Sequence, residues 1–258
     1  MNMAKRTMTE LHCHILPGID DGAKDLECSL ALLREEKKQG VGSIVFTPHF
    51  NIDKISVEDF VAARNNAYQK LAENEEFQAM NFSTKLASEV YFSVSLDKAK
   101  LDDLCFGDTD YILIDFPFHF KPHGMMYMID NVINRGYTPI IAHVERYDYV
   151  SKDPTILYDL VERGCLSHVN AEVLIKNSSK SSLPMKYIKW GLVHFICTDC
   201  HSIEKRPPNI EQGYSIVKNK LGEKYYETLT ENAKRVFNGK RIDLSEIKRP
   251  RNFLGTWI

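Results

Sequence analysis

Short runs of β-branched residues alternate with amphipathic stretches along most of this 258-residue chain, and this alternation restricts the fold more than any other feature. The runs GSIVFT at residues 42–47 and TPIIAH at residues 138–143 have the length and composition of buried strands. The amphipathic stretch at residues 26–39 spaces its leucines as a helix does and ends at Gly40. Such alternation with short loops predicts parallel strands joined by right-handed crossovers.

The same unit repeats along the rest of the chain. Further strands are predicted at residues 82–89, 111–115, 166–170 and 192–198, in addition to a first strand that ends at His12 and His14. Further helices are predicted at residues 57–76, 125–135, 154–163, 181–190, 210–220 and 224–237. About seven strand–helix units in a chain of this length favour an α/β barrel over an open sheet.

No linker rich in Pro or Ser and no change in composition divides the chain, so we expect one domain over residues 1–258. Residues 1–7 are expected to be flexible. Residues 249–258 form a C-terminal tail that is apolar for an exposed end. We expect this tail to pack on the body or to form a subunit contact, so a homo-oligomer is an open alternative.

Composition excludes several classes of function. The net charge is −2, and no run of Lys or Arg indicates a nucleic-acid surface. No window approaches the 18 apolar residues that suggest a membrane span. The basic residues near the N-terminus are not followed by an apolar stretch, which argues against a secretory signal, and the six scattered cysteines are expected to be free thiols. We therefore expect a cytoplasmic protein.

Residues that can ligate metal ions stand at the ends of successive predicted strands. Neutral imidazole and carboxylate groups suit Zn, Mn or Fe, and the carboxyl ends of parallel strands meet at one rim. An isolated H-x-H or D-x-H is a weak signal that a packed or solvated pair also explains. Nine such residues at successive strand ends are a much stronger signal. They are His12, His14, Asp21, His49, Glu89, Asp115, His143, Asp199 and His201.

The segments around these residues resemble a known family. The segments are LHCHILPGIDDGAKD, TPH, SEVY, YILIDFPF, AHVERY and TDCHS, spread from about Glu10 to Pro207. Together they are similar to the PHP (polymerase and histidinol phosphatase) superfamily, and within it to the tyrosine phosphatases encoded with capsule and exopolysaccharide genes. HCHILPGIDDG is the most specific of them, whereas H-x-H alone does not separate this subfamily from other PHP enzymes.

The resemblance implies a distorted (β/α)7 TIM-like barrel with three divalent metal ions, Mn²⁺ being the first choice and Fe, Zn or Mg the alternatives. His12, His14, Glu89 and Asp199 would hold one ion, and Glu89 would bridge to a second ion held also by Asp115 and His143. Asp21, His49 and His201 would hold the third ion. The family more often has Glu at position 115, where the shorter side chain is expected to loosen the second site, and it often has Ala at position 200.

Two arginines follow ligands closely, Arg146 after His143 and Arg206 after His201. Guanidinium groups bind phosphate bidentately, and the resemblance implies that these two arginines do so. Surface ion pairing, for instance of Arg146 with Glu145, is the alternative. Cys200 and Arg206 also have the C-x5-R spacing of cysteine-based phosphatases, but the intervening HSIEK contains no glycine and includes a glutamate that would repel phosphate.

The chemistry expected of this site is hydrolysis of a phosphate monoester. Clustered divalent ions lower the pKa of bound water to about 7 and clamp phosphoryl oxygens. We predict a protein-tyrosine phosphatase whose partner is a phosphotyrosine protein, in particular the tail of a cognate bacterial tyrosine kinase of polysaccharide export. The alternatives are a small-molecule phosphatase of the histidinol-phosphate kind and a non-catalytic metal-bound scaffold.

The remaining histidines and several aromatic residues are open to two interpretations. His168 and His194 are predicted to be satisfied core residues. His119 and His123 lie in a loop near the expected mouth, where solvation is favoured over contact with substrate. Phe116, Phe118, Phe120 and Tyr91 either line a pocket for a phenol ring or pack in the core.

Overall fold

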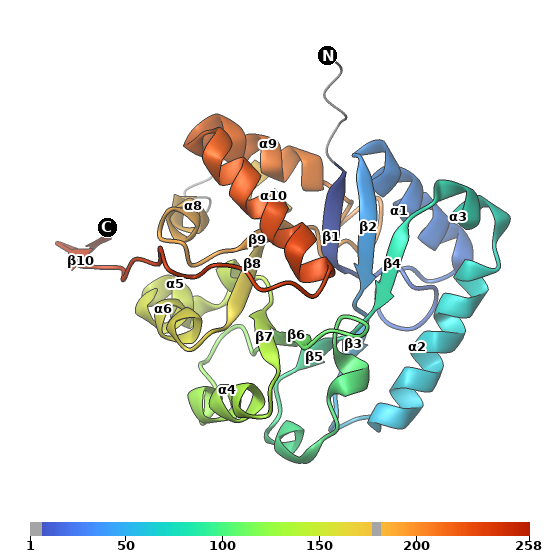
Figure 1. Ribbon diagram of the computed structural model, residues 1–258, viewed down its shortest axis with the longest axis horizontal. Helices are drawn as coiled ribbons and strands as arrows, with labels where there is room; N and C mark the ends of the chain where they lie inside the picture. Colours follow the sequence, from blue (N-terminus) through green and yellow to red (C-terminus); the bar gives the residue numbers. More distant parts are fainter. Residues whose placement is uncertain (1–6, 177–181) are drawn as a thin grey trace.

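The computed structural model describes residues 7–176 and 182–258, so the segment expected to be flexible, residues 1–7, lies outside the described part except for Thr7. Parallel strand segments surround the centre of the molecule and helices cover them (Figure 1). The segments are β1 (Met8–Cys13), β2 (Val41–Phe46), β3 (His49–Phe50), β4 (Ser83–Leu86), β5 (Glu89–Tyr91), β6 (Tyr111–Asp115), β7 (Thr138–Ile141), β8 (Leu166–Asn170) and β9 (Phe195–Cys197). They form sheets of order β1-β2-β4 and β3-β5-β6-β7-β8-β9.

Two strands of the barrel are each broken into two segments at the same level. The chain between β2 and β3 includes Pro48, which has no N–H to donate, and the chain between β4 and β5 bends beside it. The ladder continues across the break, because Ala87 N–H donates to Phe46 O at 2.9 Å and Glu89 N–H donates to Pro48 O at 3.0 Å. The single strand predicted at residues 82–89 is therefore wrong, and the segments β1 to β9 occupy seven barrel positions.

Backbone hydrogen bonds between the first and last strands close the barrel just beyond their ends. Cys13 forms a parallel bridge with Cys200, Asp199 N–H donates to His12 O and His14 N–H donates to Cys200 O, both at 2.9 Å. The predicted distorted (β/α)7 barrel is confirmed. Closure of the barrel brings the segment HCH at residues 12–14 next to the segment TDCH at residues 198–201, although the two are nearly two hundred positions apart in sequence.

Helices surround the strands and pack an apolar layer against them. The α-helices are α1 (Leu26–Lys38), α2 (Val57–Ala72), α3 (Glu75–Met80), α4 (Met125–Asn134), α5 (Asp148–Lys152), α6 (Thr155–Glu162), α7 (Ala171–Ile175), α8 (Ser182–Lys189), α9 (Ile210–Leu221) and α10 (Glu223–Phe237). Short 3-10 turns are η1 (Val94–Lys98), η2 (Asp102–Leu104) and η3 (Val144–Arg146). The single helix predicted at residues 57–76 is wrong at its end, because Asn74 accepts a hydrogen bond from Phe77 N–H and starts α3.

Side chains alternate between the barrel interior and the helical layer, as strands require. On β6, Tyr111 and Leu113 belong to the interior cluster, whereas Ile112 and Ile114 pack with the helices. Residues Ala233, Val236 and Phe237 of α10 join the interior cluster, so this helix fills the mouth at the amino ends of the strands. The side chains of β6 that face the interior are Tyr111, Leu113 and, at the opposite mouth, Asp115. The polar residues at the ends of the strands gather at this mouth.

The C-terminal tail packs on the body through its base. It forms a hairpin of β10 (Asn252–Phe253) and β11 (Thr256–Trp257), which lies at the edge of the molecule in Figure 1. The Lys186 ammonium of α8 donates to Trp257 O at 2.6 Å, and Trp257 packs partly against the core. Of the two expectations for this tail, contact with the body is observed. In the part of the chain that is described, no helix is long and apolar enough to cross a membrane.

Candidate metal centre

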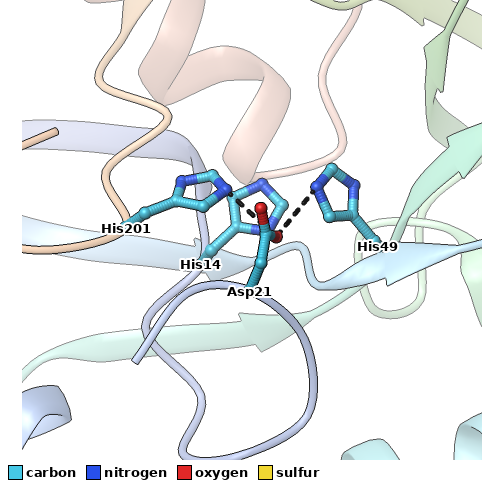
Figure 2. A group of neighbouring side chains, drawn as sticks. All are labelled: His14, Asp21, His49 and His201. Carbon is cyan, nitrogen blue, oxygen red and sulfur yellow. Dashed lines mark ion pairs between the residues drawn. The ribbon is translucent and has the colours of Figure 1, made fainter. Parts of the chain in front are cut away.

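The rim of the barrel that carries the carboxyl ends of the strands gathers all nine predicted ligands. One group consists of His14, Asp21, His49 and His201, whose ligand atoms lie within 4.8 Å of one another. Asp21 lies between two imidazoles, with its Oδ1 atom 3.3 Å from His49 Nε2 and 3.4 Å from His201 Nε2 (Figure 2). Asp21 and His49 are exposed, so this group forms the solvent side of the centre.

The other candidate groups lie deeper and share residues. They are His12, His14 and Glu89; His12, His143 and Asp199; and Glu89, Asp115 and His143, all of them buried. Glu89 belongs to two of these groups, and its Oε2 atom lies 3.3 Å from His12 Nε2 while its Oε1 atom lies 2.8 Å from His143 Nε2. Asp115 reaches this group despite its short side chain, 3.7 Å from His143 Nε2. Glu89 thus lies between these buried groups, and its role as a ligand that bridges two ions stays a prediction.

Two of the candidate ligands have an unusual backbone conformation. His143 has φ of +28° and Asp199 has φ of +53°, values that are rare for residues with a side chain. Such strained conformations persist where the surrounding structure enforces them, and they are common at functional sites. Here they occur directly after β7 and β9, where the chain turns out of the barrel.

Cations fit this set of donors. Within the described residues, His143 Nδ1 is buried without a hydrogen-bond partner. Glu89 Oε2 is buried among three imidazoles, 3.3 Å from His12 Nε2, 3.2 Å from His14 Nε2 and 2.8 Å from His49 Nδ1. The Nε2 atoms of His12 and His14 face each other at 3.1 Å, a contact that needs a proton or a cation between two imidazoles. Burial alone would lower the pKa of His143, but its hydrogen bond to Glu89 and the charge of Asp115 raise it to about 9. The site therefore favours positive charge.

His168 lies behind the centre and contacts one of its ligands. Its Nε2 atom lies 2.9 Å from His12 Nδ1 and accepts a hydrogen bond from His143 N–H at 3.3 Å. Because Nε2 is thus an acceptor, His12 must carry its proton on Nδ1, which leaves His12 Nε2 free to ligate. Burial, together with the nearby His12 and His143, keeps the pKa of His168 well below its usual range, so the ring stays neutral. The prediction of an ordinary core residue missed this contact.

Asp20 and Glu10 accept hydrogen bonds from candidate ligands, and neither was predicted from the sequence. Asp20 Oδ2 accepts hydrogen bonds from His14 Nδ1 at 2.7 Å and from His49 N–H at 3.1 Å. Although burial alone would raise the pKa of Asp20, the hydrogen bond and charge of His14 lower it to about 2. Glu10 accepts from His12 N–H at 2.9 Å and from Thr198 N–H at 3.0 Å, so it joins the ends of β1 and β9.

Gly22 allows the loop with Asp20 and Asp21 to lie against His14. A Cβ atom at this position would lie 2.1 Å from His14 O and 2.5 Å from His14 Cβ, which real structures do not tolerate. The adjoining Ala23 N–H donates to His14 O at 3.0 Å. The GIDDG motif therefore requires glycine at its end for a close backbone approach.

Both predicted arginines reach over the centre to Asp199. Arg146 Nη1 lies 3.2 Å from Asp199 Oδ2, and Arg206 Nη2 forms a shorter ion pair with the same oxygen. The guanidinium of Arg146 also lies over the ring of Phe118, 5.2 Å from its centroid. The alternative pairing of Arg146 with Glu145 is not among the ion pairs of the described residues. Both arginines remain partly exposed, at 36% and 28% of their side chains.

The cysteine-based alternative is not supported by the geometry. The Sγ atom of Cys200 points to Glu36 Oε1 at 3.7 Å, in the layer of α1, and the residue is fully buried. Arg206 instead faces Asp199 and His201. Cys13 is likewise buried and its Sγ donates to Val45 O at 3.5 Å, so it points away from the centre as predicted. The six cysteines are all free.

The other residues considered from sequence lie at varied places. His119 is exposed and pairs with Asp148 at 3.0 Å, and neither His119 nor His123 belongs to a candidate metal group. His194 lies near the far mouth, and burial lowers its pKa to about 4. Among the aromatics, Phe116 is core, Phe118 is half-buried, and Tyr91 and Phe120 are exposed.

Comparison with known proteins agrees with this geometry. The tyrosine-protein phosphatase YwqE of Bacillus subtilis is 31% identical over 239 residues, covering 91% of this chain and 93% of that protein. The tyrosine-protein phosphatase CpsB of Streptococcus pneumoniae is 29% identical over 247 residues, covering 91% of this chain and all of that protein. The names of both relatives give the enzyme class that was predicted from the sequence.

Solved structures agree as well. One, described as YwqE from Bacillus subtilis and CpsB from Streptococcus pneumoniae, unique metal-dependent tyrosine phosphatases, matches with a TM-score of 0.84 at 28% identity, covering 95% of this chain and 100% of that chain. The phosphotriesterase homology protein of Escherichia coli matches with a TM-score of 0.54 at 9% identity, over 90% of this chain and 98% of that chain, and supports the fold alone.

The profile of the family described as "Capsular polysaccharide synthesis, CpsB/CapC" matches residues 8–238, which include every candidate ligand and both arginines. The chain therefore belongs to the CpsB/CapC family, which confirms the resemblance found in its sequence.

Proposed function

We propose that this chain is a metal-dependent protein-tyrosine phosphatase that acts in the cytoplasm on a phosphotyrosine protein of capsule or exopolysaccharide synthesis. The observation that carries the proposal is the meeting of five imidazoles, four carboxylates and two arginines at one rim of the barrel. The relatives named tyrosine-protein phosphatases support the choice of substrate class. A tyrosine kinase that serves the same synthesis is the proposed partner.

Three divalent ions, with Mn²⁺ preferred, would be held by the nine ligands. His12, His14, Glu89 and Asp199 are assigned to the first ion, and Glu89, Asp115 and His143 to the second. Asp21, His49 and His201 are assigned to the third, close to His14. When bound, such ions supply a water that ionises near pH ~7 and positive charge for the phosphoryl oxygens.

The protein's own side chains would orient the phosphate ester. Arg146 and Arg206 approach one point from the solvent side, so a phosphoryl group placed there receives donors from both guanidinium groups. The ring of Phe118 packs against the guanidinium of Arg146, and Tyr91, 38% exposed, offers an aromatic surface beside Asp115 for a phenol ring. A phenolate is a good leaving group because the pKa of tyrosine is about 10, so a strong general acid is not required.

The test compares two substrates and two metal states of the full-length protein. Turnover of a phosphotyrosine peptide and of histidinol phosphate is measured after EDTA treatment and after addition of Mn²⁺, with bound metal counted by elemental analysis. We expect no activity with EDTA, recovery with Mn²⁺ and a strong preference for the peptide. Preference for histidinol phosphate would assign the chain to small-molecule hydrolysis. Full activity without bound metal would refute the proposal.

A further inference from the structure

The hairpin formed by β10 and β11 presents apolar side chains to solvent. Phe253 is 64% exposed, Leu254 is 90% exposed and Ile258 is 60% exposed. The hairpin is nevertheless well formed, because Arg251 and Ile258 exchange backbone hydrogen bonds of 3.0 and 2.8 Å. Asn252 Oδ1 also accepts from Gly255 N–H at 3.0 Å. A defined apolar tip held away from the body is unusual for a surface that faces only water.

The turn of this hairpin uses a residue that its backbone disfavours. Leu254 has φ of +49° and Gly255 has φ of +80°, the signs required by a type I′ turn. Asn-Gly is the preferred pair for such a turn, because Asn tolerates the left-handed conformation and Leu does not. Leu254 is therefore unfavourable for the conformation of the turn and, being exposed, unfavourable for solvation. Its side chain is better explained by a contact made outside this chain.

The base of the hairpin is anchored and positively charged. Residues 247–258 contain Lys248, Arg249 and Arg251 and no acidic residue. Arg249 contacts Asp159 at 3.4 Å and lies over the ring of Tyr158, which fixes the base to α6. Lys248 and Arg251 are exposed and form no ion pair with any residue that the structure describes. Two cations are thus available beside an apolar tip.

We propose that this hairpin docks the protein on a membrane surface rich in anionic lipid headgroups. Phe253 and Leu254 would enter the boundary between headgroups and acyl chains, while Lys248 and Arg251 would contact the headgroup phosphates. The half-buried Trp257 would lie at the level where tryptophan is enriched in membrane proteins. The hairpin is too small to bury the roughly 800 Å² per partner of a stable protein interface, whereas insertion of a tip needs far less area.

The test uses the full-length protein with Mn²⁺ and vesicles of phosphatidylcholine with or without phosphatidylglycerol. We expect co-sedimentation only with the vesicles that contain phosphatidylglycerol, weakened by salt, together with a blue shift of tryptophan fluorescence. Trp190 is 8% exposed in the body, so the shift reports Trp257. Trp257→Phe should remove the shift and leave sedimentation largely in place.

Two variants separate the tip from the base. Leu254→Asn suits the turn, so we expect an unchanged or higher Tm and a vesicle affinity reduced roughly tenfold or more. Lys248→Gln with Arg251→Gln should reduce the affinity about 25-fold, at about fivefold for each charge. The matched control, Lys70→Gln with Lys100→Gln, removes two exposed cations elsewhere and should change nothing.

Three results would overturn the proposal. They are equal sedimentation with both kinds of vesicle, unchanged affinity of Leu254→Asn, and formation of dimers without vesicles that Leu254→Asn abolishes. The last result would identify the hairpin as a contact between copies of this chain. Hydrolysis of a small aryl phosphate should be unaffected in every variant, so the outcome is independent of the proposed phosphatase activity.

Discussion

Replacement of His168 by leucine should weaken metal binding although His168 ligates no metal. The ring accepts hydrogen bonds from His12 Nδ1–H at 2.9 Å and from His143 N–H at 3.3 Å, and it is fully buried. Leucine has a similar volume and no acceptor. Both donors would then be buried without a partner, and His12 would no longer be held in the tautomer that leaves Nε2 free to ligate.

The size of the effect follows from these two hydrogen bonds. Each buried donor without a partner costs about 1–3 kcal/mol, which lowers the free energy of unfolding. Loss of a partner that orients a metal-ligating histidine typically costs about 10- to 100-fold in metal affinity or activity. We therefore expect the Mn²⁺ concentration for half-maximal activity to rise by that factor. His168→Gln should recover part of the loss, because its amide oxygen can accept a hydrogen bond at a similar place.

The assay titrates Mn²⁺ into protein stripped with EDTA and follows both binding heat and phosphatase activity. His194→Leu is the matched control, since His194 is also a buried histidine that accepts one backbone hydrogen bond, from Ser167 N–H at 3.0 Å. It lies at the other end of the barrel, so its loss should lower Tm and leave Mn²⁺ affinity unchanged. Equal Mn²⁺ affinity in His168→Leu and in the unmodified protein would refute the assigned tautomer.

Three further predictions concern the thiol, an arginine and pH. Cys200→Ser should keep most of the activity, because Sγ faces Glu36 away from the ligands; loss of activity that EDTA does not affect would favour the thiolate mechanism. Arg206→Lys should lower kcat/KM about 10- to 100-fold with unchanged metal content, since lysine cannot bind phosphate bidentately; an equal loss of bound Mn²⁺ would contradict this role. In the metal-free protein, the pKa of His143 is raised from 6.5 to about 9. The stabilisation that protonated His143 gives to the folded state is therefore fully present below pH 6.5 and is lost as pH rises to about 9. Tm after EDTA should fall over this window, and Mn²⁺ should remove the fall. A Tm that is constant with pH after EDTA would contradict the raised pKa.

The barrel was predictable from the sequence because its strands and helices differ in the spacing of their apolar residues and in length. Residues 111–115 and 166–170 were predicted as strands with the same bounds as β6 and β8. The break at residues 87–88 was not predictable, because Phe82 to Glu89 reads as a continuous strand and the bend is enforced by pairing with the chain around Pro48. The sequence of residues 82–89 alone does not show that this segment pairs with the chain around Pro48.

The candidate ligands were predicted by their place at strand ends, whereas the residues that orient them were not. Asp20 stands beside Asp21 in GIDDG, and both are carboxylates in the same loop, so only the structure separates the one that contacts His14 Nδ1 from the one between His49 and His201. His168 lies within β8 and resembles a core residue. Alternation along β8 contained a usable signal, because Leu166, His168 and Asn170 share a face, and Asn170 donates to Asp199 at 2.9 Å.

His143 shows where strand alternation alone predicts the wrong direction. On β7 and just after it, Ile140 and Ala142 face the barrel interior and Ile141 faces the helices, so His143 would also face the helices if the strand simply continued. The positive φ of +28° turns the chain instead, and η3 begins at the next residue. The imidazole thereby reaches Glu89 at 2.8 Å, and the same turn carries Arg146 over Asp199. A ligand of the proposed second ion and one of the two arginines proposed to bind phosphate therefore depend on one strained residue, so the geometry of the proposed metal and phosphate sites is coupled through the backbone.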